Sequence, residues 1–272
     1  MGTVDFEESV NGVAVVRWNP ERDFGLDGGN SRADNFGDLL GPLIVERLST
    51  ALDIPATPQS RRLLTAGSIV HFAHSGDVVW GSGVNGKIEP AEIDAETLDI
   101  RAVRGPLSQR ILQDLGYAVP RVFGDPALLL PHLFPETIEW AQVKRRGLTV
   151  IHNVNDLDDS DSSDPDVFSP REPVWDVIHR IAESEFVIGS SLHAVIVAEA
   201  LGVPSRPCAS GSEHRLKYDD YYASTGRHDV QLATDRAEAL AIGPVRPGDI
   251  DLAPLIAAFP SDLWATVMDG EA

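Results

Sequence analysis

Residues 186–204, FVIGSSLHAVIVAEALGVP, decide the fold expected for this chain. They begin as an apolar strand ending at Gly189, continue through two serines, and then read as a helix that is apolar on nearly all sides. A helix of this composition is buried in its protein, and a strand that turns directly into such a helix is typical of a βαβ unit. The segment therefore predicts an α/β protein.

Outward from this segment, the rest of the chain shows the same alternation of strands and helices. Apolar residues at helical spacing predict helices at residues 36–48, 107–115, 174–182 and 191–202. Short apolar runs that end at a glycine or a turn predict buried parallel strands at residues 13–18, 63–67, 77–83, 98–103, 147–153 and 185–189, with a further strand at 204–209.

The alternation predicts two Rossmann-like, doubly wound lobes with a central cleft. A Pro-rich connection at residues 120–135 places the boundary between an N-terminal lobe, residues 1–135, and a C-terminal lobe, residues 136–272. The C-terminal lobe carries the GSSLHA helix, and a helix at the C-terminus is free to pack back on the N-terminal lobe. We found no repeat and no heptad pattern.

Composition limits the partners of the chain. Its 272 residues contain 22 Lys+Arg against 42 Asp+Glu, a formal net charge of −20, which disfavours nucleic acid and acidic lipid as partners. If the chain binds an anionic ligand, a few hydrogen-bond donors or cations clustered in one place must hold it. The chain shows no run that predicts a transmembrane segment, no secretory signal, and a single cysteine, Cys208, so we expect a cytoplasmic protein.

In α/β sheets ligands bind beyond the carboxyl ends of the strands, and several polar motifs lie at such positions. Two are rich in glycine and predict a close approach of backbone to ligand, although helix capping and turn formation explain them equally well. The first, NFGDLLG, contributes Asn35, Gly37 and Asp38; the second, WGSGVNGK, contributes Gly81, Ser82, Gly83 and Asn85.

Two charged candidates follow the next strand. Arg104, in VRGPLSQRIL, can bind a carboxylate or phosphate through two parallel hydrogen bonds, whereas a lone arginine is more often a surface or capping residue. Asp125, in GDPALLL, is a further binding candidate, and its alternative is an Asx-type turn.

The start of the apolar helix at residues 190–193 is the most informative site. Free N–H groups and the helix dipole favour an anion at Ser190, Ser191 and Leu192. His193, in the first helical turn, fits a site where a bound anion offsets the unfavourable dipole, while a hydrogen-bonded structural histidine is the alternative. Lys217, one of only three lysines, is a candidate for neutralising phosphate or for proton transfer.

Together these motifs resemble the polysaccharide pyruvyltransferase family, most closely the bacterial exopolysaccharide ketal pyruvyltransferases of the xanthan type. The matching segments extend from residue 35 to about residue 226 and are NFGDLLG, AGSIVHFA, VVWGSGVNGK, VRGPLS, GDPALLL, SSLHAVIVAEALGVP and KYDDYYAS, in that order.

The resemblance implies a two-lobed fold like that of the GT-B glycosyltransferases. It also implies transfer of a pyruvyl group from phosphoenolpyruvate to a sugar diol, with a ketal as product and neither cofactor nor metal. The acceptor is a saccharide, lipid-linked or nascent, at the inner face of the membrane. Arg104 matches the family's donor-binding arginine, His193 its catalytic histidine and Lys217 its downstream lysine.

One position departs from the family pattern. Many members have an arginine two residues before the histidine, where this chain has Ser191. Arg206, Arg215 and Arg227 are candidates to replace the missing cation.

Other interpretations stay open on the sequence alone. The chain could be a nucleotide-sugar glycosyltransferase of the GT-B type, or a saccharide-binding protein of the same fold without catalysis. The aspartates of residues 156–166 could bind calcium, but they lack the glycine and final glutamate of an EF-hand loop.

Overall fold

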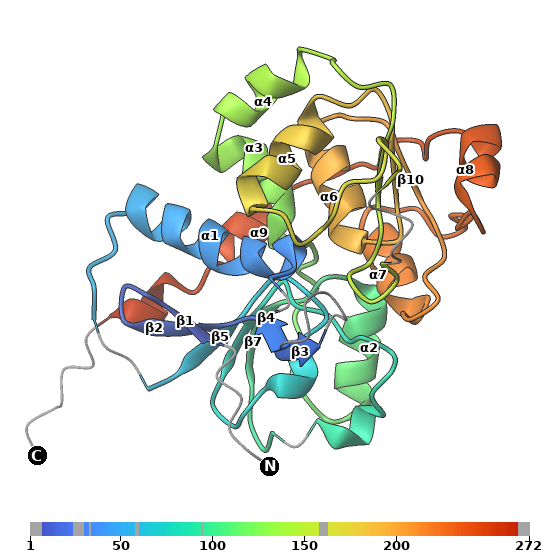
Figure 1. The fold of residues 1–272 in the computed structure, drawn as a ribbon. Coiled ribbons are helices and arrows are strands. Elements are labelled where there is room, and N and C mark those ends of the chain that lie inside the picture. The colour runs from blue at the N-terminus through green and yellow to red at the C-terminus, as the bar shows by residue number, and fades with distance from the viewer. Residues whose placement is uncertain are drawn as a thin grey trace, which may run out of the picture.

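The computed structural model describes residues 7–23, 30–32, 34–57, 60–93, 95–157 and 163–265. Within them the chain forms a five-stranded sheet, a three-stranded sheet and a two-stranded hairpin, with helices between and around the two larger sheets (Figure 1). The predicted α/β class is confirmed. The two-lobed GT-B arrangement stays a prediction.

The first sheet belongs to the N-terminal part of the chain. Its strands lie in the order β1 (Glu7–Val10), β2 (Val13–Val16), β5 (Arg62–Leu64), β6 (Val78–Trp80) and β7 (Asp99–Ala102). From β2 to β7 neighbouring strands are parallel, as the apolar runs predicted.

Strand β1 was not predicted, and it makes the first sheet mixed. It pairs antiparallel with β2 through a two-residue turn of Asn11 and Gly12, which have φ angles of 48° and 88°. Asn-Gly is the sequence that such hairpin turns favour, because both residues tolerate positive φ. The four residues of β1 are mostly exposed, so they lack the apolar pattern of the other strands.

Both faces of the first sheet are covered. Val15, Leu63 and Trp80 point into a core that they share with α1 (Phe36–Ala51). Leu64 and Val79 point to the opposite core, under η1 (Val70–Phe72), η2 (Pro90–Glu92) and α2 (Pro106–Asp114). Strands buried on both faces read as continuous apolar runs, which is why they could be predicted.

The second sheet is fully parallel and belongs to the C-terminal part. Its order is β10 (Ser205–Pro207), β9 (Val187–Gly189) and β8 (Thr149–Ile151). The apolar helix predicted after β9 is α6 (Leu192–Ala200), and all of it from Leu192 to Ala198 is buried. Helix α5 (Val174–Ala182) packs against α6.

Helix α1 lies between the first sheet and the pair α5 and α6 (Figure 1). One hydrophobic core cluster therefore runs from Val13 and Val78 in the first sheet to Ile151 and Val187 in the second. The two sheets share this core on one face, and each also buries a smaller cluster on its other face.

The remaining elements complete the layers around this core. They are the hairpin strands β3 (Glu21–Asp23) and β4 (Asn30–Arg32), with η3 (Pro126–Leu129), α3 (Leu130–Leu133), α4 (Glu136–Ala141), α7 (Leu216–Ser224), α8 (Arg236–Ile242), α9 (Ala253–Ala257) and η5 (Ser261–Trp264).

The C-terminal segment returns to the first sheet. The indole N–H of Trp264 donates to the backbone oxygen of Val10 at 3.0 Å, and that of Trp80 donates to the backbone oxygen of Leu255 at 2.9 Å. The two indoles also pack on either side of Phe259. These contacts tie the end of the chain to its beginning.

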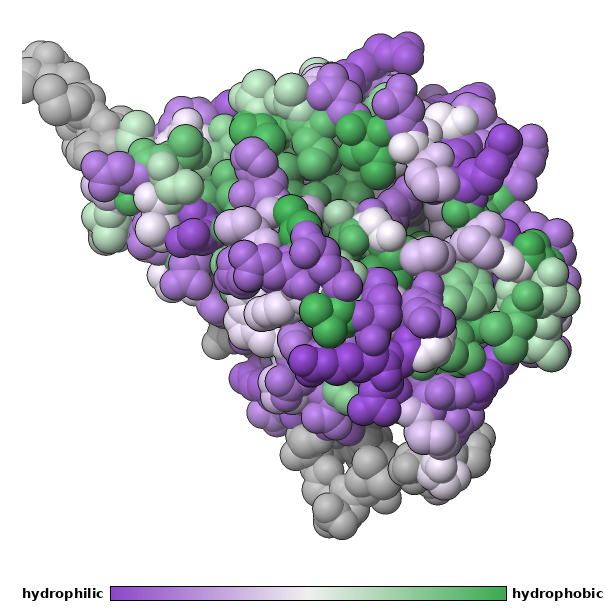
Figure 2. Space-filling view, turned by 90° about the horizontal axis from the view of Figure 1, so that it is seen from above, coloured by the Kyte–Doolittle hydropathy of each residue, from purple (hydrophilic) through white to green (hydrophobic). Residues whose placement is uncertain are grey.

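The face seen in Figure 2 carries both hydrophilic side chains and areas where apolar side chains gather. Exposed large apolar side chains include Ile138 and Val143 near α4 and Leu240 and Ile242 of α8. Among the helices that the structure describes, none has the length and apolarity needed to cross a membrane.

Candidate functional site

A pocket of about 230 Å³ lies where the carboxyl ends of the two sheets meet. Every strand from β2 to β10 that takes part in parallel pairing leads into residues that line it. They are Trp18 after β2, Gly67 and Ser68 after β5, Asn85 and Lys87 after β6, Arg104 after β7, Asn153 and Asn155 after β8, Ser191, Leu192 and His193 after β9, and Glu213 and Lys217 after β10. The rule that ligand sites lie at strand carboxyl ends therefore located the pocket.

His193 lies in the first turn of α6 and lines the pocket with only 8% of its surface exposed. Its ring packs directly on Gly37 of α1: a Cβ added at Gly37 would lie 2.3 Å from Nδ1 of the imidazole. Any larger residue at position 37 would displace the ring. Gly37 thus belongs to the site as a packing surface, although it does not line the pocket itself.

Lys217 enters the pocket from the first turn of α7 and is 5% exposed. Burial lowers its pKa to about 8, and the nearby carboxylate of Glu213 opposes that shift. Its Nζ lies 3.5 Å from Oε2 of Glu213. An ammonium with so few protein ligands keeps the capacity to bind an anion.

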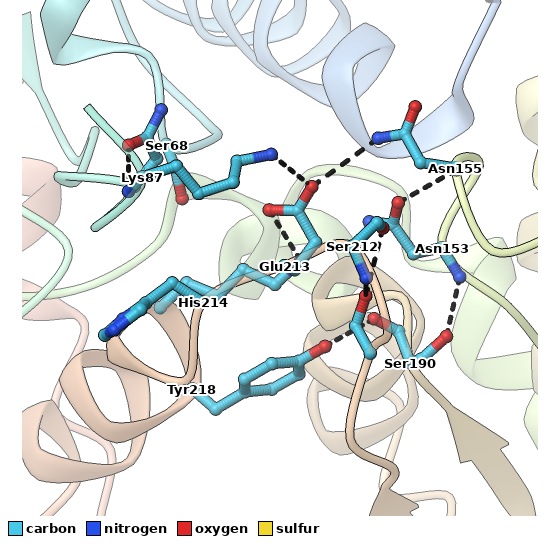
Figure 3. A network of polar contacts seen from close by, with 12 residues as sticks. Ser68, Lys87, Asn153, Asn155, Ser190, Ser212, Glu213, His214 and Tyr218 are labelled. Atoms are coloured by element: carbon cyan, nitrogen blue, oxygen red, sulfur yellow. Dashed lines mark hydrogen bonds and ion pairs between the residues drawn. The ribbon is translucent and has the colours of Figure 1, made fainter.

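Glu213 contacts both lysines of the pocket, and Figure 3 shows its carboxylate between Lys87 and Asn155. Its Oε1 accepts a hydrogen bond from Lys87 Nζ at 2.6 Å and one from the amide of Asn155 at 3.5 Å. Lys87 and Lys217 are two of the three lysines in the chain, so most of its ammonium groups meet at this carboxylate. An anionic ligand reaching both lysines must compete with Glu213.

Arg104 is fully buried beneath the pocket wall. Its Nε donates to Oδ2 of Asp220 at 3.1 Å, and its two terminal nitrogens donate to Ser68 Oγ at 2.5 Å and to the Val84 oxygen at 3.0 Å. The guanidinium packs on Gly83, where an added Cβ would lie 2.4 Å from its central carbon. Arg104 thus lines the pocket but is also the partner of a buried carboxylate.

Asn35 and Asp38, at the start of α1, also line the pocket. The amide of Asn35 donates to Oδ2 of Asp38 at 2.6 Å. Burial raises the pKa of Asp38, while His193 and the Asn35 hydrogen bond oppose the shift. A carboxyl group that ionises less readily leaves the pocket more favourable to an anion.

Three residues of the WGSGVNGK motif lie behind the residues that line the pocket. Gly81 has a φ of +86°, and a Cβ there would lie 2.4 Å from Pro126. Ser82 donates to the Gly67 oxygen at 3.0 Å, and Gly83 makes room for Arg104. Only Asn85 of the predicted set from this motif lines the pocket.

Asp125 and Ser190 also lie behind the pocket lining. Asp125 caps η3 by accepting from the Ala127 N–H at 3.0 Å, the Asx-type turn that the sequence offered as an alternative. The Ser190 hydroxyl links Asn153 to Asp156, accepting from the first at 2.8 Å and donating to the second at 3.0 Å. Figure 3 also shows Tyr218, whose hydroxyl donates to the Ser190 backbone oxygen at 2.6 Å.

None of the three arginines considered as replacements for the family arginine lines the pocket. Arg206 donates to the backbone oxygens of Gly243 and Gln231, Arg215 pairs with Asp219, and Arg227 pairs with Glu199. The additional cation in the pocket is Lys87.

Sequence reasoning missed Lys87, Glu213, Asn153, Asn155 and His71. Lys87 closes the WGSGVNGK motif, and His71 belongs to the quoted AGSIVHFA segment, so a signal was present for both. Asn153 follows directly on a predicted strand. Glu213 had no local signal, because the loop after β10 brings it to Lys87 from a distant part of the chain.

The acidic stretch considered for calcium is partly outside the described residues, which omit 158–162. Of its described members, Asp164 and Asp166 pair with Arg236, and Asp156 accepts from Ser190 and Ser210. The described residues contain no cluster of three or more His, Cys, Asp or Glu side chains suited to a metal ion.

Cys208 is buried, and burial raises its pKa to about 11.

The chain is thus an α/β protein with a pocket at its converging strand ends, and lysine, arginine and histidine side chains line that pocket. Residues 56–212, more than half of the chain, match the family model described as polysaccharide pyruvyl transferase. The chain therefore belongs to the polysaccharide pyruvyl transferase family.

The chain is also similar to the succinoglycan biosynthesis protein ExoV of Rhizobium meliloti (strain 1021), with 30% identity over 176 residues. The similarity covers 61% of this chain and 54% of that relative. The chain thus matches about half the length of this curated relative. No solved structure shows a significant match.

Proposed function

We propose that this protein is an enzyme that transfers a pyruvyl group from phosphoenolpyruvate to two hydroxyls of one sugar in an exopolysaccharide or cell-surface glycan precursor. The family match and the similarity to a succinoglycan biosynthesis protein support pyruvyl transfer in polysaccharide synthesis. The observation that carries the choice of donor is the meeting of Lys87, Lys217 and Arg104 in one small pocket of a chain with a net charge of −20.

The donor is small and carries a carboxylate and a phosphate. The pocket of about 230 Å³ is below the roughly 300–1,000 Å³ usual for drug-sized ligands, which suits a three-carbon acid. Lys87 and Lys217 approach the pocket as ammonium groups, and the N–H groups at the start of α6 add donors beside Ser191. These groups would hold the phosphate and the carboxylate.

The reaction conserves all atoms of donor and acceptor. The methylene carbon of phosphoenolpyruvate gains a proton, C2 forms bonds to two sugar oxygens, and the bond between C2 and the phosphate oxygen breaks. The two hydroxyl protons are accounted for by the new methyl group and by the departing hydrogen phosphate. No oxidant, reductant or water is consumed.

In this scheme His193 would move the proton. It lies in the pocket beside Asp38, whose raised pKa reflects burial at the same site. Lys217 and Arg104 would stabilise the negative charge of the leaving phosphate.

Other residues of the pocket lining suit the acceptor. Trp18, Ile69, Phe72 and Ile88 contribute apolar surface to the lining, and Asn85 and Asn155 contribute amides. A pyranose ring presents apolar C–H faces together with hydroxyl groups, so it can use both kinds of surface. A saccharide rather than a second small acid is the acceptor that these residues favour.

The test is mass spectrometry of candidate glycosides incubated with the protein and phosphoenolpyruvate. We expect a product heavier by one pyruvate less one water, with one phosphate released per product. His193→Ala is expected to abolish phosphate release while folding survives, and the matched control His132→Ala, at an exposed position of α3, is expected to retain it.

The same protein should be stabilised against heat by phosphoenolpyruvate. Stabilisation by UDP- or GDP-sugars without any effect of phosphoenolpyruvate would contradict the proposal and favour a glycosyltransferase. Acceptor binding without a product from any donor would favour a saccharide-binding protein.

A further inference from the structure

Two buried polar atoms face each other behind the pocket without another partner. Nε2 of His193 lies 3.6 Å from Oδ2 of Asp125. Within the described residues neither atom has a hydrogen-bond partner, and both are buried. Leaving such groups unpaired costs free energy, so buried polar atoms of this kind are normally satisfied.

The surroundings fix the two groups toward each other. The other carboxylate oxygen of Asp125, Oδ1, accepts from the Ala127 N–H, which holds the carboxyl group at the start of η3. Gly37 closes the opposite side of the imidazole. Asp125 is fully buried and does not line the pocket, so its free oxygen meets the histidine rather than a ligand.

The two ring nitrogens of His193 differ in access. Nε2 is buried against Asp125, whereas Nδ1 is not among the buried unpartnered atoms of the described residues. Because Nε2 faces Asp125, Nδ1 is the nitrogen that remains for exchange with a ligand, and it lies beside Gly37, next to the pocket that His193 lines.

From this arrangement we propose that Asp125 is a positioning residue for His193. Its carboxylate accepts a hydrogen bond from Nε2–H, which leaves Nδ1 as the nitrogen that exchanges a proton with the substrate. The inference rests on the proposed function for the substrate, but the tautomer it assigns belongs to the protein alone. A separation of 3.6 Å is long for a hydrogen bond, and such contacts in catalytic sites tighten when substrate binds.

Other charged groups act on the same imidazole. Asp38 of α1 interacts electrostatically with His193, and Lys217 of α7 and Glu213 of the loop before it line the same pocket. Asp125 from η3 adds a carboxylate at the buried side of the ring. A carboxylate there favours the protonated imidazole over the neutral one, and replacing it by an amide removes that attraction.

The test uses Asp125→Asn, which keeps an oxygen able to accept from Ala127 but replaces the other carboxylate oxygen by an amide. We expect ¹⁵N NMR of the full chain to assign the Nε2–H tautomer to neutral His193 in the native protein. In the variant the amide donates to Nε2 and the signal moves toward the Nδ1–H tautomer. The control Asp235→Asn, at the exposed cap of α8, should leave the signal unchanged.

Kinetics supply the second measurement. We expect Asp125→Asn to lower kcat on the order of 100-fold, the lower end of the range for general acid–base catalysis. KM for phosphoenolpyruvate should change little, and the acidic limb of the pH profile should move to lower pH. A merely structural role would leave the pH profile and the tautomer as they are.

The outcomes separate this inference from the proposed function. The role of Asp125 would be overturned if the native protein transfers pyruvyl groups and Asp125→Asn changes neither the His193 tautomer nor the pH profile of activity. A tautomer that shifts as expected in a protein without pyruvyl transfer would support the pair and contradict the proposed reaction.

Discussion

Burial changes the titration of one pocket residue, Lys217. Its pKa is lowered to about 8 because burial disfavours the ammonium form, and Glu213 recovers only part of that loss. The side chain is therefore protonated at neutral pH and loses its charge within the range in which the protein can be studied. The candidate site therefore contains a group, the Lys217 ammonium, that titrates near physiological pH.

We predict that the affinity for phosphoenolpyruvate decreases as pH rises above 8, by about tenfold per unit, because only protonated Lys217 attracts the donor. Calorimetric titration between pH 7 and 9.5 measures this slope. Lys217→Met should bind weakly at pH 7 and lose the slope. Lys144→Met, which changes the exposed third lysine outside the pocket, should keep it.

At the scale of elements, the start of α2 is capped by a residue of α7. Oδ1 of Asp220 accepts from the N–H groups of Leu107 and Ser108, both at 2.9 Å, and Oδ2 accepts from Arg104 and from the Ser108 hydroxyl. Gly105 permits the approach, since a Cβ there would lie 2.0 Å from the Asp220 backbone oxygen. Arg104 and the helix end thus depend on one carboxylate.

We predict that Asp220→Ala costs about 3–5 kcal/mol of unfolding free energy, because it leaves a buried arginine without its partner. Asp235→Ala removes a cap from α8 at an exposed position and should cost about 1 kcal/mol. Urea denaturation of both variants measures the difference. Equal losses would show that Asp220 acts as an ordinary cap.

The elements themselves were largely predictable from the sequence. Burial on all sides makes an element apolar along its whole length, and such a run is visible in the sequence. Strands β5 and β6 and helix α6 are examples. Strand β1 was missed because it is mostly exposed, and the polar hairpin of β3 and β4 has no apolar alternation to reveal it.

The site was predictable only where strand ends identify it. His193, Lys217, Asp38 and Asn85 all line the pocket, as the motifs indicated. Which charges pair with one another is decided by tertiary contacts. The partner of Arg104 is Asp220, 116 residues away, and no spacing in the sequence reveals that pairing.

At the scale of the whole molecule, the continuous core favours unfolding as a single unit. The cluster that contains Val13 and Val78 also contains Ile151 and Val187, and it includes Trp264 at the end of the described chain. Subdivision of the chain would have to cut through this core and through the contacts of Trp264 with Val10.

We predict one cooperative transition in scanning calorimetry, with a calorimetric enthalpy equal to the van't Hoff enthalpy. Trp264→Ala should lower the midpoint of that transition without splitting it, since truncation of a buried tryptophan costs about 3–5 kcal/mol. Two resolved transitions in the native protein would instead support two independently folding lobes.

The bond between Arg104 and Asp220 also bears on how the protein matures during synthesis. Arg104 leaves the ribosome long before its carboxylate partner, and a guanidinium destined for full burial has no counterion until α7 has been translated. The nascent N-terminal part therefore cannot assemble its share of the pocket on its own. The complete set of pocket residues is therefore expected to assemble only after α7 has been translated.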